Sequence, residues 1–436
     1  MSRRYTRRRL LGVGGLTAIG SFAGCTIGWS GDADRNEGNL VPDLPQVENP
    51  PDAVYIPTHR EAMRHLPAVE AGEYMLSPMI TYPHSFWLVT GTEREEVTPV
   101  DGRGVHLMVT LWDAETGRVL PVDAGATMRV LKDGDLVDQR APWPMISQTM
   151  GFHFGDNVSL PEDGTYAVEV DLNPIEVEKT GAFEGRFTER VTASFTFEYD
   201  DAFRRDVIGG VEYLDESYWG QRGALEPPMA GDHEHAGHGD SDDGGHDHED
   251  HGHHDDDDEH HHDDGHHDGD EHHHNHGHDQ EDERESNHQH GEHHAEDSGH
   301  EEHHHNGHHM PFSALPEAET YPGVDLGEHE SGDARFVVRY LRDSRFADGG
   351  YLLVSPRTPY NRVPLADMAL SVEGDIEADL QQTLDSELGL HYGASVELLS
   401  GDTFELVVGG PPQVSRHAGY ETAFLTMAPM QVTVPE

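Results

Sequence analysis

The residues of this 436-residue chain that could do chemistry are a few histidines and methionines close together in the sequence. His153 stands in GFHFGDNV, shortly after Met145 and Met150, and His84 stands in TYPHSFW, shortly after Met79. Imidazole nitrogen and thioether sulfur together make a ligand set that suits Cu(I) or a polarizable divalent ion. The spacing predicts one metal site that draws on these residues, with Met145 and Met150 as alternatives. Each methionine could instead fill the core of a sandwich, and His153 could be a hydrogen-bonded structural residue.

The sequence around His153 recurs late in the chain. GFHFGDNVSLPEDGTYAVEV, from Gly151, aligns without a gap with GLHYGASVELLSGDTFELVV, from Gly389. Glycine, valine, leucine, threonine and an aromatic residue follow both histidines at equal offsets. The chain therefore contains an internal repeat, in which His391 takes the place of His153. His417 follows an arginine in VSRHAGYETAF and is a further candidate ligand.

Residues 226 to 310 differ in kind from the rest of the chain. This segment holds 28 of the 36 histidines, with Asp, Glu and Gly at most other positions. So few apolar residues cannot offset the entropy of ordering the chain, and the composition therefore predicts a disordered loop. Its imidazoles and carboxylates would make weak, exchangeable sites for copper, zinc, nickel or cobalt. The alternative is a solvating linker, although acidic residues alone would serve that purpose.

Short segments of alternating hydrophobicity surround these candidates. In VHLMVTLWD, residues 105 to 113, one face carries the apolar residues Val105, Leu107, Val109 and Leu111. His106 falls on the other face and is expected to be a surface residue. The stretch HREAMRHLPAVEAG, residues 59 to 72, has a brief helical period instead.

Several short strands, separated by Gly, Asp and Pro turns, indicate antiparallel sandwiches of the immunoglobulin type. We therefore expect an all-β protein made of two immunoglobulin-like antiparallel β-sandwiches. The first would occupy residues 51–225 and the second residues 311–436, joined by the disordered loop at 226–310.

The N-terminus has the pattern of an export signal. Arg7 and Arg8 precede a short apolar run that ends in FAGC, so residues 1–25 are expected to be a twin-arginine lipoprotein signal peptide. Cys25 would become the lipidated first residue, and a plain signal peptide is the alternative. Residues 26–50 would then tether the protein to the outer face of the cytoplasmic membrane. Because Cys25 is the sole cysteine, intrachain disulfides and cysteine-based zinc sites are excluded.

The charge balance narrows the function classes. The formal net charge is −56, from 84 acids against 28 bases, and Lys132 and Lys179 are the two lysines. Such an acid excess is typical of a protein kept soluble in very high salt, and it excludes nucleic acid as a partner. The sequence has neither an HExxH motif nor a phosphate-binding glycine loop, so we expect no enzyme activity. Redox chemistry at a bound copper or iron ion stays open.

Three segments together resemble a known family. PMISQTMGFHFGDNV, GLHYGASV and VSRHAGYETAF are similar to the periplasmic high-affinity iron-transport proteins, which are small immunoglobulin-like proteins that bind copper or iron and assist uptake across the envelope. The resemblance implies that His153 and His391 are motif histidines, that Met145 is the upstream methionine and that His417 is the later histidine. It also implies an early histidine and glutamate pair in one strand, for which His84 and His106 are the nearby histidine candidates.

The chain departs from this family pattern in both halves. The repeat alignment puts Phe187 where the first sandwich would need its later histidine, and no methionine precedes His391 at the expected distance. We nevertheless expect a membrane-anchored extracytoplasmic lipoprotein that captures iron or copper, with zinc as a further candidate, for transport through a membrane permease. Pairing into a homodimer is implied by the resemblance alone. The alternatives are a metal buffer for detoxification and a structural or interaction module without metal.

Overall fold

The computed structural model describes residues 42, 44–99, 104–227 and 310–436. Within this part the chain is almost entirely β, with one α-helix, α1 (Asp201–Gly209), so the expected all-β fold of sandwich-like sheets is confirmed. The export signal with Cys25, most of the tether and the histidine-rich loop at 228–309 lie outside the described residues. No helix in the described ranges is both long and apolar enough to cross a membrane.

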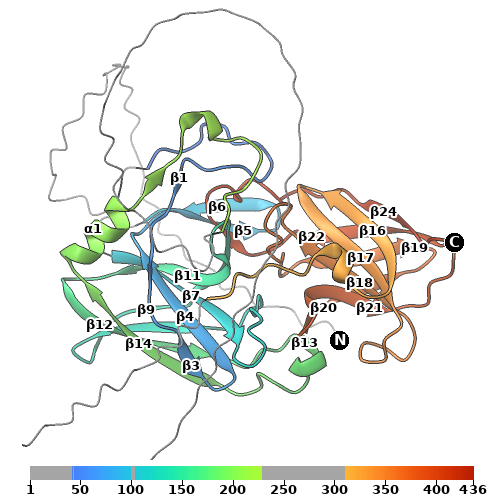
Figure 1. Cartoon of the computed structure of the whole chain (residues 1–436), viewed down its shortest axis with the longest axis horizontal. Coiled ribbons are helices and arrows are strands. Elements are labelled where there is room, and N and C mark those ends of the chain that lie inside the picture. The colour runs from blue at the N-terminus through green and yellow to red at the C-terminus, as the bar shows by residue number, and fades with distance from the viewer. Residues whose placement is uncertain (1–41, 43, 100–103, 228–309) are drawn as a thin grey trace, which may run out of the picture. The chain divides into compact units, whose positions relative to one another are not determined.

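The first half is built on two sheets that enclose a hydrophobic core (Figure 1). One has nine strands in the order β2-β4-β7-β11-β10-β23-β5-β6, with β3 also paired to β4. Its strands are β2 (Arg64–His65), β3 (Val69–Ala71), β4 (Tyr74–Thr81), β5 (Phe86–Thr90), β6 (Glu93–Val97), β7 (Gly104–Asp113), β10 (Trp143–Ser147), β11 (Gly151–Ser159) and β23 (Ser415–Arg416). The other has the order β14-β12-β8-β9 and consists of β8 (Thr127–Lys132), β9 (Asp135–Arg140), β12 (Gly164–Leu172) and β14 (Val191–Tyr199).

The second half forms one strongly bent sheet around its own part of the core. The order is β16-β17-β18-β21-β20-β19-β22-β24, with β13 also paired to β20. The strands are β16 (Val324–Ser331), β17 (Ala334–Leu341), β18 (Tyr351–Arg357), β19 (Ala369–Gly374), β20 (Ala378–Asp385), β21 (Gly389–Ser395), β22 (Thr403–Gly410), β24 (Met430–Thr433) and β13 (Glu178–Thr180). A separate pair joins β1 (His59–Arg60) to β15 (Glu212–Tyr213), and three short 3₁₀ turns are η1 (Gly181–Phe183), η2 (Glu216–Tyr218) and η3 (Ala318–Thr320).

The alternation in β7 shows how the sequence positions a site. Its apolar residues enter the core as predicted, namely Val105, Leu107, Val109 and Leu111. Successive strand residues point to opposite faces, so His106 and Met108 lie on the other face of the nine-stranded sheet. Both are fully buried, so the expectation that His106 is a surface residue is wrong. The residues that cover this face come from distant segments of the chain.

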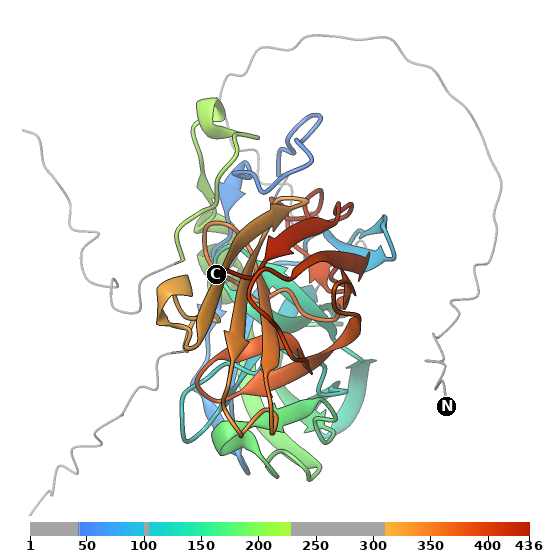
Figure 2. The same ribbon diagram turned by 90° about the vertical axis from the view of Figure 1, so that its right-hand side faces the viewer.

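The two halves exchange strand ends. β23 belongs to the second half of the chain but pairs in parallel with β10 and in antiparallel with β5 of the first half. Reciprocally, β13 of the first half pairs in parallel with β20 of the second, where it lies beside the orange-red strands (Figure 2). The described residues before 228 and those from 311 onward therefore belong to one compact unit.

Candidate metal site

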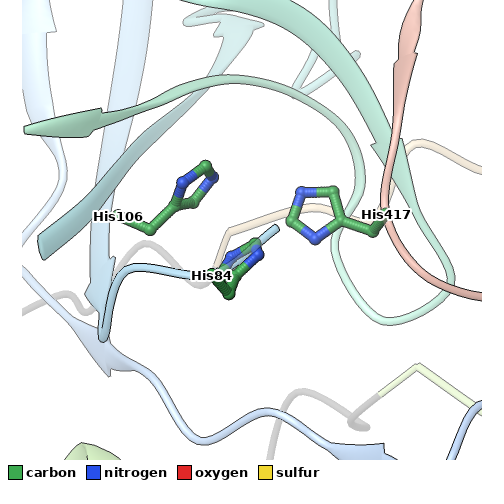
Figure 3. Close-up of side chains that lie close together, drawn as sticks. All are labelled: His84, His106 and His417. Atoms are coloured by element: carbon green, nitrogen blue, oxygen red, sulfur yellow. The ribbon is translucent and has the colours of Figure 1, made fainter. Parts of the chain in front are cut away.

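Four buried histidines meet on the outer face of the nine-stranded sheet. His84 lies between β4 and β5, His106 on β7, His153 on β11, and His417 directly after β23. One nitrogen from each of His84, His106 and His417 lies within 4.8 Å of the others, and Figure 3 shows the three rings around one space. Nε2 of His153 is 3.1 Å from Nε2 of His417. Such a group of imidazoles, drawn from both halves of the chain, is compatible with binding a metal ion.

Strand register brings Met145 to this group. Met145 on β10 is directly opposite His153 on β11, and both side chains lie on the face that carries His106. Gly155, two residues after His153, supplies the space between them. A Cβ at Gly155 would lie 2.9 Å from Nε2 of His106 and 3.0 Å from Sδ of Met145. The thioether and the imidazole therefore border the same space, which exists because residue 155 has no side chain.

Hydrogen bonds orient three of the rings. Nδ1 of His84 lies 3.0 Å from the Ser85 carbonyl oxygen, and Nδ1 of His153 lies 3.2 Å from the Gly151 carbonyl oxygen. A carbonyl only accepts, so each Nδ1 carries the proton and donates it. Each Nε2 then keeps its lone pair, which is the form that binds metal.

Asn157 fixes the third ring. Its amide nitrogen donates to the His84 carbonyl oxygen at 2.9 Å, so its Oδ1 faces Nδ1 of His106, 3.0 Å away, and accepts from it. Among the described residues, Nε2 of His84 and Nε2 of His106 are buried without a hydrogen-bond partner. Buried polar atoms are rarely left unpaired, so two orphaned lone pairs aimed at one space fit an absent cation.

Glu61 adds one negative charge. Its Oε1 is 3.7 Å from Nδ1 of His84, and its Oε2 is 3.8 Å from Nδ1 of His417. Burial by itself would raise the pKa of Glu61, but His84, His417 and His59 around it hold that pKa below its usual range. The carboxylate is therefore ionised and favours a cation in the space between the rings.

Burial opposes protonation of three of the imidazoles. Burial is the main cause that lowers the pKa of His84, and it lowers the pKa values of His106 and His153 still further. A cation would therefore find unprotonated nitrogens near neutral pH. The donor set of imidazole nitrogen, thioether sulfur and one carboxylate fits a borderline or soft ion such as copper or iron better than a hard ion such as magnesium.

Arg416 holds the loop that carries His417. Its guanidinium is fully buried and donates to the carbonyl oxygens of Pro412 and Ala423, the first at 3.2 Å, while its plane faces the Phe424 ring. Burial lowers the pKa of Arg416 to about 9. These contacts fold the loop back on itself at the point where His417 leaves β23.

A pocket of about 410 Å³ reaches the site from outside. His84 and Glu61 line it together with His59, and its acids Glu96 and Glu421 outnumber its single arginine. Residues 42, 44–47 and 50, expected as part of a tether, also line this pocket. The excess of carboxylates makes the pocket a plausible access path for a cation.

The remaining candidates lie at different distances from the group. Met79 on β4 is fully buried and pairs with Met108, on the face that carries the histidines. Met150 is buried in the turn between β10 and β11, beyond the Met145–His153 pair. Within the described residues, one group of three or more acidic, histidine or cysteine side chains could hold an ion, namely His84, His106 and His417; His153 joins it through His417, whereas His391 does not.

Sequence patterns name His106 as a candidate for the early histidine but predict it at the surface, and they do not identify Glu61. Glu61 sits between two histidines in HREAMRH, where a helical period was expected, but this stretch holds the short strands β1 and β2. The presence of an acid within a histidine pair was the one available signal. The site needs no histidine at position 187, because His417 comes from the other half of the chain and Phe187 packs in the core.

Comparisons with known proteins are sparse. A family model described as a domain of unknown function (DUF7350) matches residues 319–433, which contain strands β16 to β24. No curated protein matches the chain.

Two solved structures of FetP from a uropathogenic Escherichia coli strain are similar to part of the chain. A copper-bound variant is 18% identical, with 31% of this chain and 97% of that chain covered and a TM-score of 0.23. The protein as isolated, expressed in the periplasm, is 16% identical, with coverage of 31% and 96% and a TM-score of 0.20. The likeness is distant, so the function has to be argued from the site itself.

Proposed function

We propose that this protein captures one copper or iron ion at the site formed by His84, His106, His153, His417 and Met145. The observation that carries the proposal is the group of four buried imidazoles, in which Nε2 of His84 and Nε2 of His106 have no hydrogen-bond partner and the Nε2 atoms of His153 and His417 lie 3.1 Å apart. Nδ1 of His153 donates to the Gly151 carbonyl oxygen, so Nε2 of His153 accepts the hydrogen bond that Nε2 of His417 donates. A cation that displaces this proton would be bound by both Nε2 atoms, with Glu61 3.8 Å from Nδ1 of His417.

We place this capture outside the cytoplasmic membrane, as part of metal transport across the envelope. The export signal and Cys25 in the sequence support that location, and a permease would receive the ion. Residues 228–309 would raise the metal concentration near the folded site, since tethering can give effective concentrations of about 1 mM over short linkers. The chain's own residues would bind and orient the ion, and we propose no turnover.

The experiment is a competition titration of the full-length protein against a chromophoric Cu(I) chelator, and against an Fe(II) chelator, in high salt. A competitor of suitable strength suppresses weak binding by the histidine-rich loop. We expect each chain to bind one ion tightly and His153→Ala to abolish this binding. The control His329→Ala should keep it, because the His329 ring bonds to the Leu326 carbonyl oxygen far from the site. If the protein is instead a metal buffer, it should bind many ions more weakly, and His153→Ala should have no effect. If it is an interaction module, it should bind no ion tightly.

A further inference from the structure

We propose that the molecule contains a second, degenerate copy of the metal site, centred on His391, in which hydrogen bonds have replaced metal ligation. This inference rests on the proposed function for the identity of the ligand positions. If so, each chain binds one metal ion tightly, and not two. The contact between the halves that surrounds His391 then forms without metal.

The two halves have the same strand order. β3-β4-β7-β11 in the first half corresponds to β16-β17-β18-β21 in the second. β8, β12 and β14 correspond to β19, β22 and β24, while β9 and β10 together correspond to the long strand β20. The exchanged strands also correspond, since β13 lies between β12 and β14 and β23 lies between β22 and β24. The halves are thus linked by two equivalent junctions, β10 with β23 and β20 with β13.

Register identifies the residue at the place of Met145. His153 is opposite Met145, which is itself paired with Ser415. In the second junction His391 is opposite Thr383, which is paired with Glu178. Thr383 therefore stands where Met145 stands in the first junction.

The same register identifies the residue at the place of His417. His417 follows Ser415 by two residues, and Thr180 follows Glu178 by two residues on the equivalent exchanged strand. The residue equivalent to His417 is therefore Thr180, and not Phe187, which the repeat alignment placed there.

The place of His106 is found in the neighbouring strands. Gly155 pairs with Met108, and Gly393 pairs with Leu353. Two residues earlier on each of these strands stand His106 and Tyr351. The two glycines are equivalent in their surroundings too, because a Cβ at Gly393 would lie 2.2 Å from the Tyr351 ring, as one at Gly155 would meet His106.

Two local contacts are repeated in the second junction. Nδ1 of His391 lies 3.1 Å from the Gly389 carbonyl oxygen, which reproduces the bond that orients His153. Lys179 donates to the carbonyl oxygen of Ile175 at 2.6 Å, four residues earlier, as Arg416 does to a carbonyl four residues earlier. The geometry that presents a metal ligand is therefore still present around His391.

The chemistry of the second junction is different. The free nitrogen of His391, Nε2, is occupied by the Tyr351 hydroxyl at 3.2 Å. The Thr180 hydroxyl donates to the buried Asp385 carboxylate at 2.8 Å. Thr383, Thr180 and Tyr351 thus carry neutral hydroxyls where the first junction has a thioether and two imidazoles. Such hydroxyls are poor ligands for copper or iron, and here each has a hydrogen-bond partner. The side chains of this junction are therefore paired without a metal, whereas the first junction has orphaned lone pairs.

The test introduces the ligand types of the first junction at the equivalent positions of the second. The full-length protein carries Thr180→His, Tyr351→His and Thr383→Met together. The readout is copper per chain retained after Cu(I) loading and passage over a chelating resin, with circular dichroism to establish folding. We expect the triple variant to retain one ion more than the wild type. A folded triple variant with no additional ion would overturn the proposal.

A second measurement needs no redesign. His391→Ala in the wild type should leave the retained copper unchanged, while His153→Ala should remove one ion. Loss of an ion in His391→Ala would show a working second site and would also overturn the proposal. If the wild type retains no ion, the proposed function fails, but a gain in the triple variant would still establish the ligand positions of the second junction.

Discussion

Replacement of Gly155 by alanine tests whether the space above this residue is the metal position. The backbone of Gly155 is not in the left-handed region, so alanine can adopt its conformation. The new Cβ would lie 2.9 Å from Nε2 of His106, 3.0 Å from Sδ of Met145 and 3.2 Å from Cγ of Met108, where ordinary contacts begin at 3.4 Å. The imidazole and the thioether must therefore retreat by about 0.5 Å.

That displacement is larger than a coordination site tolerates. Metal–ligand distances hold to about 0.2 Å, so the variant cannot keep both ligands at their bonding distance. We expect Gly155→Ala to weaken Cu(I) binding by about 10- to 100-fold, the loss typical of disturbed support around metal ligands. Crowding should also cost about 1–3 kcal/mol of folding free energy, against a gain of about 0.5–1 kcal/mol from removing a strand glycine.

The assay is the chelator competition described above, together with thermal unfolding of the metal-free protein. Gly409→Ala is the matched control, because Gly409 is also in a strand, β22, and its nearest atom to a new Cβ is the Ala369 carbonyl oxygen at 3.7 Å. The control should bind copper like the wild type. If Gly155→Ala binds copper as tightly as the control does, the ion does not occupy this space and the assignment of Met145 and His106 is refuted.

Three further predictions follow from the same geometry. Glu61→Gln should weaken binding of a divalent ion more than binding of Cu(I), because the lost carboxylate attracts a doubly charged ion more strongly than a singly charged one. Equal losses of affinity in parallel titrations would show that Glu61 acts only through packing. Copper at about 100 times its dissociation constant should stabilise the whole folded unit by about 2.7 kcal/mol, since its ligands come from both halves, and a chelator should reverse the rise in melting temperature. Burial lowers the pKa of His391 from 6.5 to about 4, so its contribution to stability is complete above pH 6.5 and is lost as the pH falls toward 4, by about 3 kcal/mol. His391→Gln should flatten that part of the acid denaturation profile, and an unchanged profile would contradict the burial argument.

Many of the strands, and the types of side chain offered as ligands, could be read from the sequence. Alternation in β7 and its neighbours sets which residues enter the core, and the repeat around His153 and His391 follows from matched residues at equal spacing. Local periodicity reports which face a side chain takes, because neighbouring residues in a strand must point to opposite sides. It does not report what covers that face, and for this reason His106 was expected at the surface although it is fully buried.

Which histidines lie together depends on long-range pairing of strands. β23 and β13 are two and three residues long, too short to carry a periodic pattern, and each pairs with a strand about 200 residues or more away in the chain. Their pairing depends on the edges that the two folded halves present to each other, which no local pattern encodes. That exchange brings His417 to His153 at one junction and places Thr180 near Asp385 at the other. Two segments with the same local sequence signature thereby acquire different chemistry.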